Sequence, residues 1–156
     1  MDSFDFAILD ALQQDARISN KELAARIGLA PSTCLGRVRQ LEQRGIIRRY
    51  VTELDPDALG IGLQAMLAIR IRVHSNRLFR AFSEYVLGLP EVRAVYHVSG
   101  NVDLLIHVVV RNAHHLRDFV LEQISSRDEV DRCETSLIYE EARRAKLPLY
   151  AASSHT

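Results

Sequence analysis

A cluster of arginines surrounds two neighbouring hydroxyl residues in the first third of the chain, and these side chains together could bind double-stranded DNA. Residues 17–50 include eight basic and only two acidic side chains, and such a positive patch attracts phosphates whatever the base sequence. Ser32 and Thr33 could reach phosphates or base edges, whereas Arg37 could pair with guanine through two hydrogen bonds. The remaining candidates for DNA contact are Lys21, Arg39, Arg44, Arg48 and Arg49, of which Arg39, Arg48 and Arg49 best suit phosphates.

Three short helices are expected to position this patch. Apolar residues at three- and four-residue steps near the N-terminus indicate the first helix. Ser19 and Glu22 have the spacing of a capping box for the second helix, which Gly28 ends. Pro31 suits the first turn of a third helix, and residues 46–51 look like a strand. The pattern predicts a winged helix-turn-helix, in which the third helix enters the major groove by its N-terminal end. The alternative is that Ser32 only caps its helix and the arginines are only solvated.

The hydrophobic period changes from 3.6 to 2 after Asp55-Pro56 and two nearby glycines. Strands and helices then alternate in the order βαββαβ, which is the ferredoxin-like arrangement. The predicted fold class is α+β, with an N-terminal winged helix-turn-helix domain and a C-terminal ferredoxin-like domain. The expected strands are 65–73, 92–98, 104–110 and 130–139, and the expected helices are 78–86 and 116–124.

The predicted organisation has four parts. Residues 1–52 form the DNA-binding domain and residues 53–62 a linker. Residues 63–142 form the domain for effector binding and oligomerisation, and residues 143–156 form a C-terminal tail. In the central hairpin of the second domain both faces are largely apolar, yet two helices cover only one face of a sheet. We therefore expect a homodimer in which the sheets of two copies face each other.

The turn between the two central strands could recognise a small zwitterion. Gly100 and Asn101 leave backbone N–H groups exposed next to the carboxylate of Asp103. An α-amino acid carries a carboxylate that could accept from these amides and an ammonium that could pair with Asp103. The alternative is that this segment is only a hairpin turn with a polar residue beside it.

Composition and spacing argue against several other functions. The net charge is zero, which excludes a uniformly basic nucleic-acid binder but not a locally basic one. No His-Glu-x-x-His or Cys-x-x-Cys spacing is present, so neither a metal site nor a cofactor is expected. In a two-residue hairpin His97 lies opposite Leu104 and His107 opposite Ala94, so the two imidazoles face opposite sides of the sheet. The two cysteines are too few for a disulfide framework. No membrane span or signal peptide is evident, and a cytoplasmic location, associated with the nucleoid, is expected.

Specific motifs in both halves of the chain match one known family. The first half contains Asp15-Ala16-Arg17-Ile18-Ser19, Gly28-Leu29-Ala30-Pro31-Ser32-Thr33-Cys34-Leu35 and Arg37-Val38-Arg39-x-Leu41-Glu42-x-x-Gly45-Ile46-Ile47. The second half contains Val98-Ser99-Gly100-Asn101-x-Asp103. With these motifs the chain resembles the Lrp/AsnC transcriptional regulators over nearly its whole length.

The resemblance implies a sequence-specific regulator of transcription whose dimers assemble into octamers and respond to an amino acid. In the family the loop and the last strand line an effector pocket between subunits, where Thr135 matches a hydroxyl position. Leu104 replaces an aromatic residue that often follows the aspartate of this loop. The implied effector-binding residues are Ser99, Gly100, Asn101, Val102, Asp103, Leu104 and Thr135. The alternative is a small ferredoxin-like dimeric enzyme, or a ligand-binding module with a vestigial DNA-binding half; we expect no catalytic activity.

Overall fold

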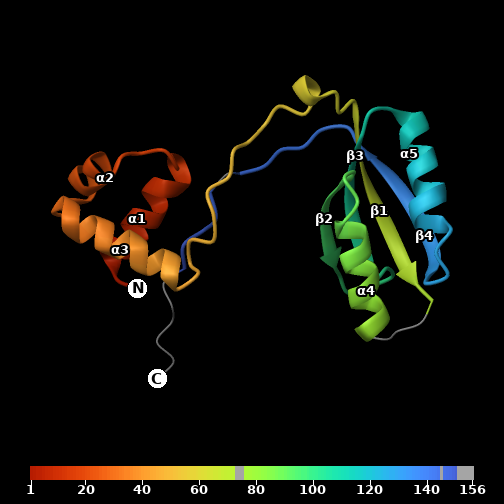
Figure 1. The fold of residues 1–156 in the computed structure, drawn as a ribbon, viewed down its shortest axis with the longest axis horizontal. Helices are drawn as coiled ribbons and strands as arrows, with labels where there is room; N and C mark the ends of the chain where they lie inside the picture. Colours follow the sequence, from red (N-terminus) through yellow and green to blue (C-terminus); the bar gives the residue numbers. More distant parts are fainter. Residues whose placement is uncertain (73–75, 145, 151–156) are drawn as a thin grey trace. The chain divides into compact units, whose positions relative to one another are not determined.

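The computed structural model describes residues 1–72, 76–144 and 146–150. These residues form two compact units (Figure 1). The N-terminal unit contains Met1–Glu53 together with the chain from Ala142 onward, and the C-terminal unit contains Leu54–Glu141. Residues after 141 are thus grouped with the first unit, although they follow the last strand of the second.

The described residues of the N-terminal unit form three helices: α1 (Ser3–Gln14), α2 (Asn20–Ile27) and α3 (Pro31–Gln43). The predicted capping box of α2 is confirmed, because Ser19 accepts from the N–H of Glu22 while the Glu22 carboxylate accepts from the N–H of Ser19. Gly28 ends α2 in the left-handed conformation, with φ 78°, and Pro31 opens α3 as expected. The helices bury a shared core of Ile8, Leu9, Ala11, Leu23, Ala24, Cys34 and Leu41.

The strand expected at residues 46–51 is not formed. Ile46 and Ile47 form a bend directly after α3, and the described part of the N-terminal unit contains no strand with which residues 48–51 could pair. Ile46 and Ile47 instead pack as half-buried side chains against the helical core. Their backbone N–H groups donate to the carbonyl of Leu41 near the end of α3, whereas a strand needs a hydrogen-bonded neighbouring strand.

The described end of the chain lies along α1. Lys146 places its Nζ 2.8 Å from Oδ1 of Asp10, and the backbone N–H of Leu147 donates to the side-chain carbonyl of Gln13 at 2.6 Å. The Gln13 amide donates back to the carbonyl of Leu147 at 3.4 Å. The segment predicted to be a tail therefore contacts the N-terminal unit through α1.

The described residues of the C-terminal unit contain a four-stranded antiparallel sheet with strand order β2-β3-β1-β4. This order and the βαββαβ sequence confirm the predicted ferredoxin-like fold; Val73, the last residue of the first expected strand, lies outside the described residues. A 3₁₀ turn, Asp57–Leu59, precedes the sheet. The elements are β1 (Leu63–Ile71), α4 (Asn76–Leu87), β2 (Val92–His97), β3 (Leu104–Val110), α5 (Ala113–Phe119), a π-helical continuation (Val120–Ser125) and β4 (Val130–Ile138).

One face of this sheet carries both helices (Figure 1). Alternate residues of β1 and β3 are buried there with Phe82 of α4 and Phe119 of α5. The predicted hairpin register is confirmed, since His97 pairs with Leu104 and Ala94 with His107. The ring of His97 therefore lies on the helix-covered face, 4.0 Å from the ring of Phe79 between centroids. His107 lies on the opposite face and hydrogen-bonds to Gln64 at 2.9 Å.

Gly62, just before β1, provides a sharp test of this packing. A Cβ at this position would lie 2.6 Å from the backbone carbonyl oxygen of Arg111, which follows the paired strand β3. We expect Gly62→Ala to destabilise the C-terminal unit by about 1–3 kcal/mol, as overpacked positions typically do. Chemical denaturation followed by circular dichroism measures this loss. An unchanged midpoint would contradict the described β1–β3 approach.

Candidate functional site

The third helix, α3, presents a polar face to solvent and an apolar face to its own unit. Cys34 and Leu41 are buried, whereas Ser32, Gly36 and Arg39 are exposed and lie on the opposite side of the helix. The N-cap residue is Ala30, and no side chain caps the helix. Ser32 therefore does not act as the cap, which was the alternative to its role in binding. Its hydroxyl and that of Thr33 are exposed at the N-terminal end of the helix.

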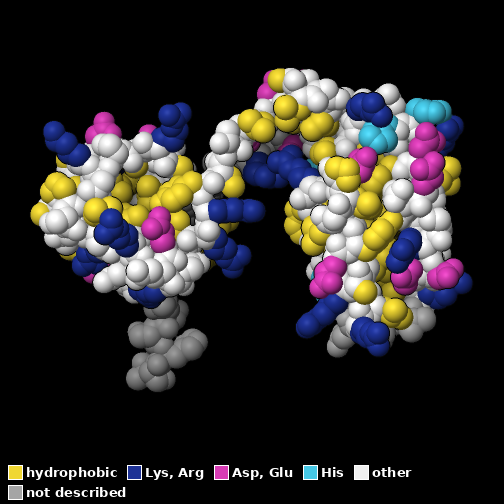
Figure 2. Space-filling view, in the orientation of Figure 1, with side chains coloured by type: hydrophobic (Ala, Val, Ile, Leu, Met, Phe, Trp, Pro, Cys, Tyr) yellow, Lys and Arg dark blue, Asp and Glu magenta, His cyan; other side chains and the backbone are white. Residues whose placement is uncertain are grey.

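The basic residues around this face are open to solvent. Figure 2 shows more Lys and Arg than acidic side chains on the visible surface of the N-terminal unit. Within the part of the chain that the structure describes, none of five exposed basic residues forms an ion pair with a carboxylate. Their charges are thus available to phosphates. They are Lys21, Arg39, Arg44, Arg48 and Arg49.

Arg37 differs from these residues. Its Nη1 lies 2.8 Å from Oδ2 of Asp2 and 2.9 Å from Oδ1 of Asp5, and its guanidinium stands 5.5 Å from the ring centre of Phe4. The two carboxylates, Asp5 above all, raise the pKa of Arg37. A hydrogen bond from the backbone N–H of Asp5, together with Arg37, lowers the pKa of Asp2 despite partial desolvation. Arg37, which we expected to pair with guanine, is thus ion-paired with two carboxylates of its own unit.

Gly36 lies near the middle of the exposed face of α3. Apart from its two chain neighbours and the backbone of its own helix, a Cβ at this position would meet no heavy atom of the described residues within 4 Å. We expect Gly36→Ala to stabilise the N-terminal unit by about 1 kcal/mol, because glycine is a poor helix former. Thermal denaturation of the full chain measures the change. A lower melting temperature would contradict the solvent-facing placement of this position.

The loop predicted to bind an effector is anchored to the end of β1. The backbone N–H of Asp103 donates to the carbonyl of Ile69 at 2.9 Å. One carboxylate oxygen of Asp103 accepts from the N–H of Ile71 at 2.8 Å. Ser99, Gly100 and Asn101 form the exposed tip of the loop, whereas Val102 and Asp103 are half-buried. Asp103 therefore has a structural role in this chain besides any contact with a ligand.

Two further residues implied by the family resemblance lie apart from the loop tip. Leu104 is fully buried in the core between sheet and helices, because it falls on the helix-covered face of β3. Its side chain is thus shielded from a ligand at the loop tip, and we do not retain it as an effector contact. Thr135 is exposed on the edge strand β4, in register with Leu67 of β1. Since β1 separates β4 from the hairpin, one chain does not bring Thr135 and the loop together.

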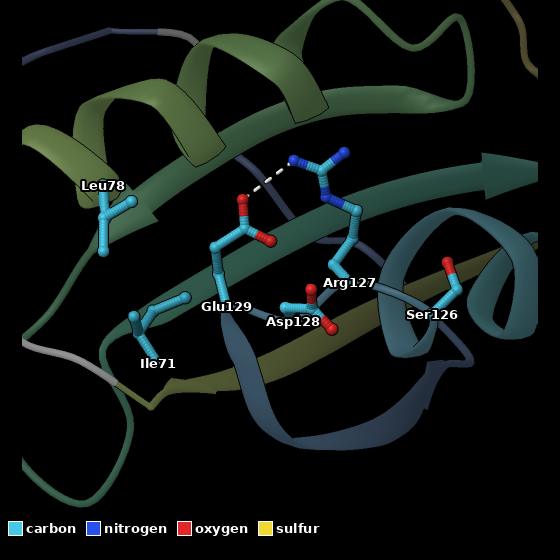
Figure 3. Close-up of a pocket in the computed structure, with 6 residues that line it drawn as sticks. All are labelled: Ile71, Leu78, Ser126, Arg127, Asp128 and Glu129. Atoms are coloured by element: carbon cyan, nitrogen blue, oxygen red, sulfur yellow. Dashed lines mark hydrogen bonds and ion pairs between the residues drawn. The ribbon is translucent and has the colours of Figure 1, made fainter.

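A cavity of about 520 Å³ opens at the same end of β1. Figure 3 shows Arg127 and Glu129 paired within it, at 2.9 Å. A backbone hydrogen bond and this guanidinium lower the pKa of Glu129, and the guanidinium also stands 4.4 Å from the ring centre of Tyr85. Because the charges of the pair compensate each other, we assign no ligand to the cavity. Its lining residues form no motif in the sequence and were not among the predicted site residues: Ile71, Leu78, Ser126, Arg127, Asp128 and Glu129.

Two free cysteines lie in the described regions, Cys34 buried and Cys133 half-buried. Burial raises the pKa of both thiols, Cys34 and Cys133, which disfavours the reactive thiolate. Among residues 1–72, 76–144 and 146–150, no group of three or more His, Cys, Asp or Glu side chains could hold a metal ion. In the same ranges no helix has the length and apolar character needed to cross a membrane.

Comparison with known proteins identifies the class to which these two units belong. Residues 1–48 match the family described as winged helix-turn-helix DNA-binding, and residues 64–147 match the Lrp/AsnC ligand binding domain. The chain is 42% identical to the HTH-type transcriptional regulator AldR of Mycolicibacterium smegmatis, over 93% of this chain and 85% of that protein. It is 37% identical to the leucine-responsive regulatory protein of Rhizobium meliloti, with 93% of each chain covered.

Solved structures agree with this assignment. A transcriptional regulator of Neisseria meningitidis in complex with L-methionine superposes with a TM-score of 0.88 at 33% identity, covering 95% of this chain and 96% of that one. Escherichia coli AsnC gives a TM-score of 0.84 at 26% identity, covering 94% and 97%. The chain belongs to the Lrp/AsnC family of DNA-binding transcriptional regulators. The predicted family and fold class are thereby confirmed, and the alternative of a ferredoxin-like enzyme or a vestigial module is not favoured.

Proposed function

We propose that this regulator contacts double-stranded DNA through the exposed face of α3 and the basic residues around it. The observation that carries the proposal is that these basic side chains are exposed and unpaired with carboxylates in the described chain, whereas Arg37 is ion-paired. Hydroxyls at the start of the helix supply short contacts, and the basic residues supply charge. The proposed DNA contacts are Ser32, Thr33, Lys21, Arg39, Arg44, Arg48 and Arg49.

We further propose that two copies pair through the face of the sheet that the helices leave open. Met66, Leu105 and Val109 are half-buried on this face, and Tyr96 is 47% exposed. A second copy of the sheet would cover these side chains and would present two recognition helices to one duplex. Assembly of such dimers into an octamer is the expected higher state. Sedimentation of the full chain measures both; a monomer at micromolar concentration would contradict the pairing.

The proposed effector is an α-amino acid bound at the loop of residues 99–103. Support comes from the exposed loop tip beside the Asp103 carboxylate and from the Neisseria meningitidis relative, which was solved with L-methionine. The contacts retained in the proposal are Ser99, Gly100, Asn101, Val102 and Asp103, with Thr135 contributed by β4 of another subunit. A ligand that contacts more than one subunit would shift DNA affinity or assembly.

The proposal gives the protein no catalytic role and places it in the cytoplasm, on the nucleoid. Its test uses the full chain and a labelled duplex selected by this protein from a random-sequence pool, with an unselected duplex of equal length as control. We expect tighter binding to the selected duplex, and a change in affinity or stoichiometry with one of the twenty amino acids, L-methionine being the first probe. Failure to enrich any duplex would contradict the DNA-binding role, whereas enrichment without any amino-acid response would contradict only the effector.

A further inference from the structure

The side of α3 that carries Arg37 faces the first helix. Cys34 and Leu41, three residues before and four residues after Arg37, are both fully buried. Residues at these spacings share one side of a helix. The Arg37 side chain is 28% exposed, and the Asp5 side chain beneath it is only 12% exposed. Arg37 therefore lies at the border of the buried face, turned away from Gly36 and Arg39 on the outward face.

The two carboxylates that hold Arg37 also form the N-terminal cap of α1. Oδ1 of Asp2 accepts from the N–H of Asp5 at 3.0 Å, and Oδ2 of Asp5 accepts from the N–H of Asp2 at 3.2 Å. Each carboxylate uses its other oxygen for Nη1 of Arg37. The capping box of the first helix and the anchor of the recognition helix are thus a single network, in which Phe4 contributes its ring.

This arrangement disfavours a direct contact between Arg37 and DNA. One guanidinium between two carboxylates leaves a local net charge that is negative, and a phosphate approaching this point would be repelled. The unpaired arginines elsewhere on the unit have no such neighbours in the described chain. Charge therefore favours DNA at the outward face and disfavours it at Arg37.

We propose that Arg37, Asp2 and Asp5 are positioning residues that fix the orientation of α3 on α1, so that its outward face meets the bases in register. The inference rests on the proposed DNA-binding function and assigns Arg37 a role inside the protein. The ion pair supplies a fixed, directional contact between the two helices, where apolar packing alone is non-directional. A tilted recognition helix would still carry its charge but would lose its alignment with base edges.

The test compares Arg37→Ala, Asp5→Asn and their double variant with Arg39→Ala as the outward-facing control. Affinity is measured on selected and unselected duplexes over a range of salt concentrations, at a temperature where circular dichroism finds every variant folded. We expect Arg37→Ala and Asp5→Asn each to reduce the ratio of specific to non-specific affinity about tenfold. The double variant should be no worse than either single one, because both changes break one contact. Arg37→Lys, which keeps one charge, should restore part of the ratio.

Salt dependence separates positioning from direct binding. For Arg37→Ala the slope of log affinity against log salt should stay as in the wild type, whereas Arg39→Ala should reduce it by about 0.9 for each phosphate that the protein no longer neutralises. A reduced slope for Arg37→Ala, with Asp5→Asn binding as well as the wild type or better, would overturn the proposal in favour of direct binding by Arg37. A lower melting temperature with an unchanged specificity ratio would overturn it in favour of stability alone. If the wild type bound no duplex, the proposed function would fail first, and the positioning role with it.

Discussion

Reversing the charge of Arg39 and Arg48 together is expected to reduce duplex affinity about 100-fold or more, because repulsion replaces attraction at each phosphate that these side chains neutralise. Both residues are exposed and unpaired with carboxylates in the described chain. The double variant Arg39→Glu/Arg48→Glu should also flatten the salt dependence of binding by about 0.9 for each phosphate left without its arginine. Fluorescence anisotropy with a selected duplex measures both quantities.

A matched control separates this effect from net charge alone. Arg77→Glu/Arg80→Glu makes the same change in total charge on the exposed side of α4, in the C-terminal unit. We expect this control to bind the duplex within a few-fold of the wild type. Equal losses in the two double variants would contradict the placement of the DNA surface around α3.

Replacing Asp103 is expected to weaken effector binding about 10- to 100-fold, the value of a hydrogen bond between charged groups. The structure also gives Asp103 the N–H of Ile71 as a partner, so two variants are needed. Asp103→Ala removes both the charge and the acceptor, whereas Asp103→Asn keeps an oxygen that can accept from Ile71. We expect Asp103→Ala alone to destabilise the C-terminal unit, by about 1 kcal/mol.

Thermal shift with the amino acid that most stabilises the wild type measures both effects at once. We expect both variants to lose the ligand-induced shift and Asp103→Asn to retain the melting temperature of the unliganded wild type. Loss of the shift only in Asp103→Ala would mean that the carboxylate supports the loop and does not bind the ammonium. Full retention of the shift in both variants would contradict the proposed effector site.

Local signals in the sequence were sufficient for most of the fold. Helix ends depend on contacts between residues a few positions apart. The structure confirms the capping box of Ser19 and Glu22, the end of α2 at Gly28 and the start of α3 at Pro31. The strand register of the central hairpin also followed from its turn. The strand predicted at residues 46–51 was wrong because a strand needs a hydrogen-bonded partner strand, and the N-terminal unit supplies none in its described residues.

The functional residues were harder to assign, since their roles depend on contacts between distant positions. Arg37 and Arg39 look alike in the sequence, and only the fold brings Asp2 and Asp5 to the first of them. Leu104 follows the loop directly, but both faces of its strand are apolar, so alternation did not indicate which face was covered. The cavity beside Arg127 likewise combines the end of β1, the start of α4 and the segment before β4.

The unpaired basic residues around α3 are proposed to form the surface that binds DNA, and a salt titration tests this surface without any assumption about the effector. The affinity of the full wild-type chain for its selected duplex is measured as salt is raised from about 50 to 200 mM. We expect log affinity to fall linearly with log salt. Arg39→Glu/Arg48→Glu should reduce the slope, and Arg77→Glu/Arg80→Glu should leave it unchanged. Binding that does not respond to salt, or a slope that Arg39→Glu/Arg48→Glu does not change, would contradict the proposed surface.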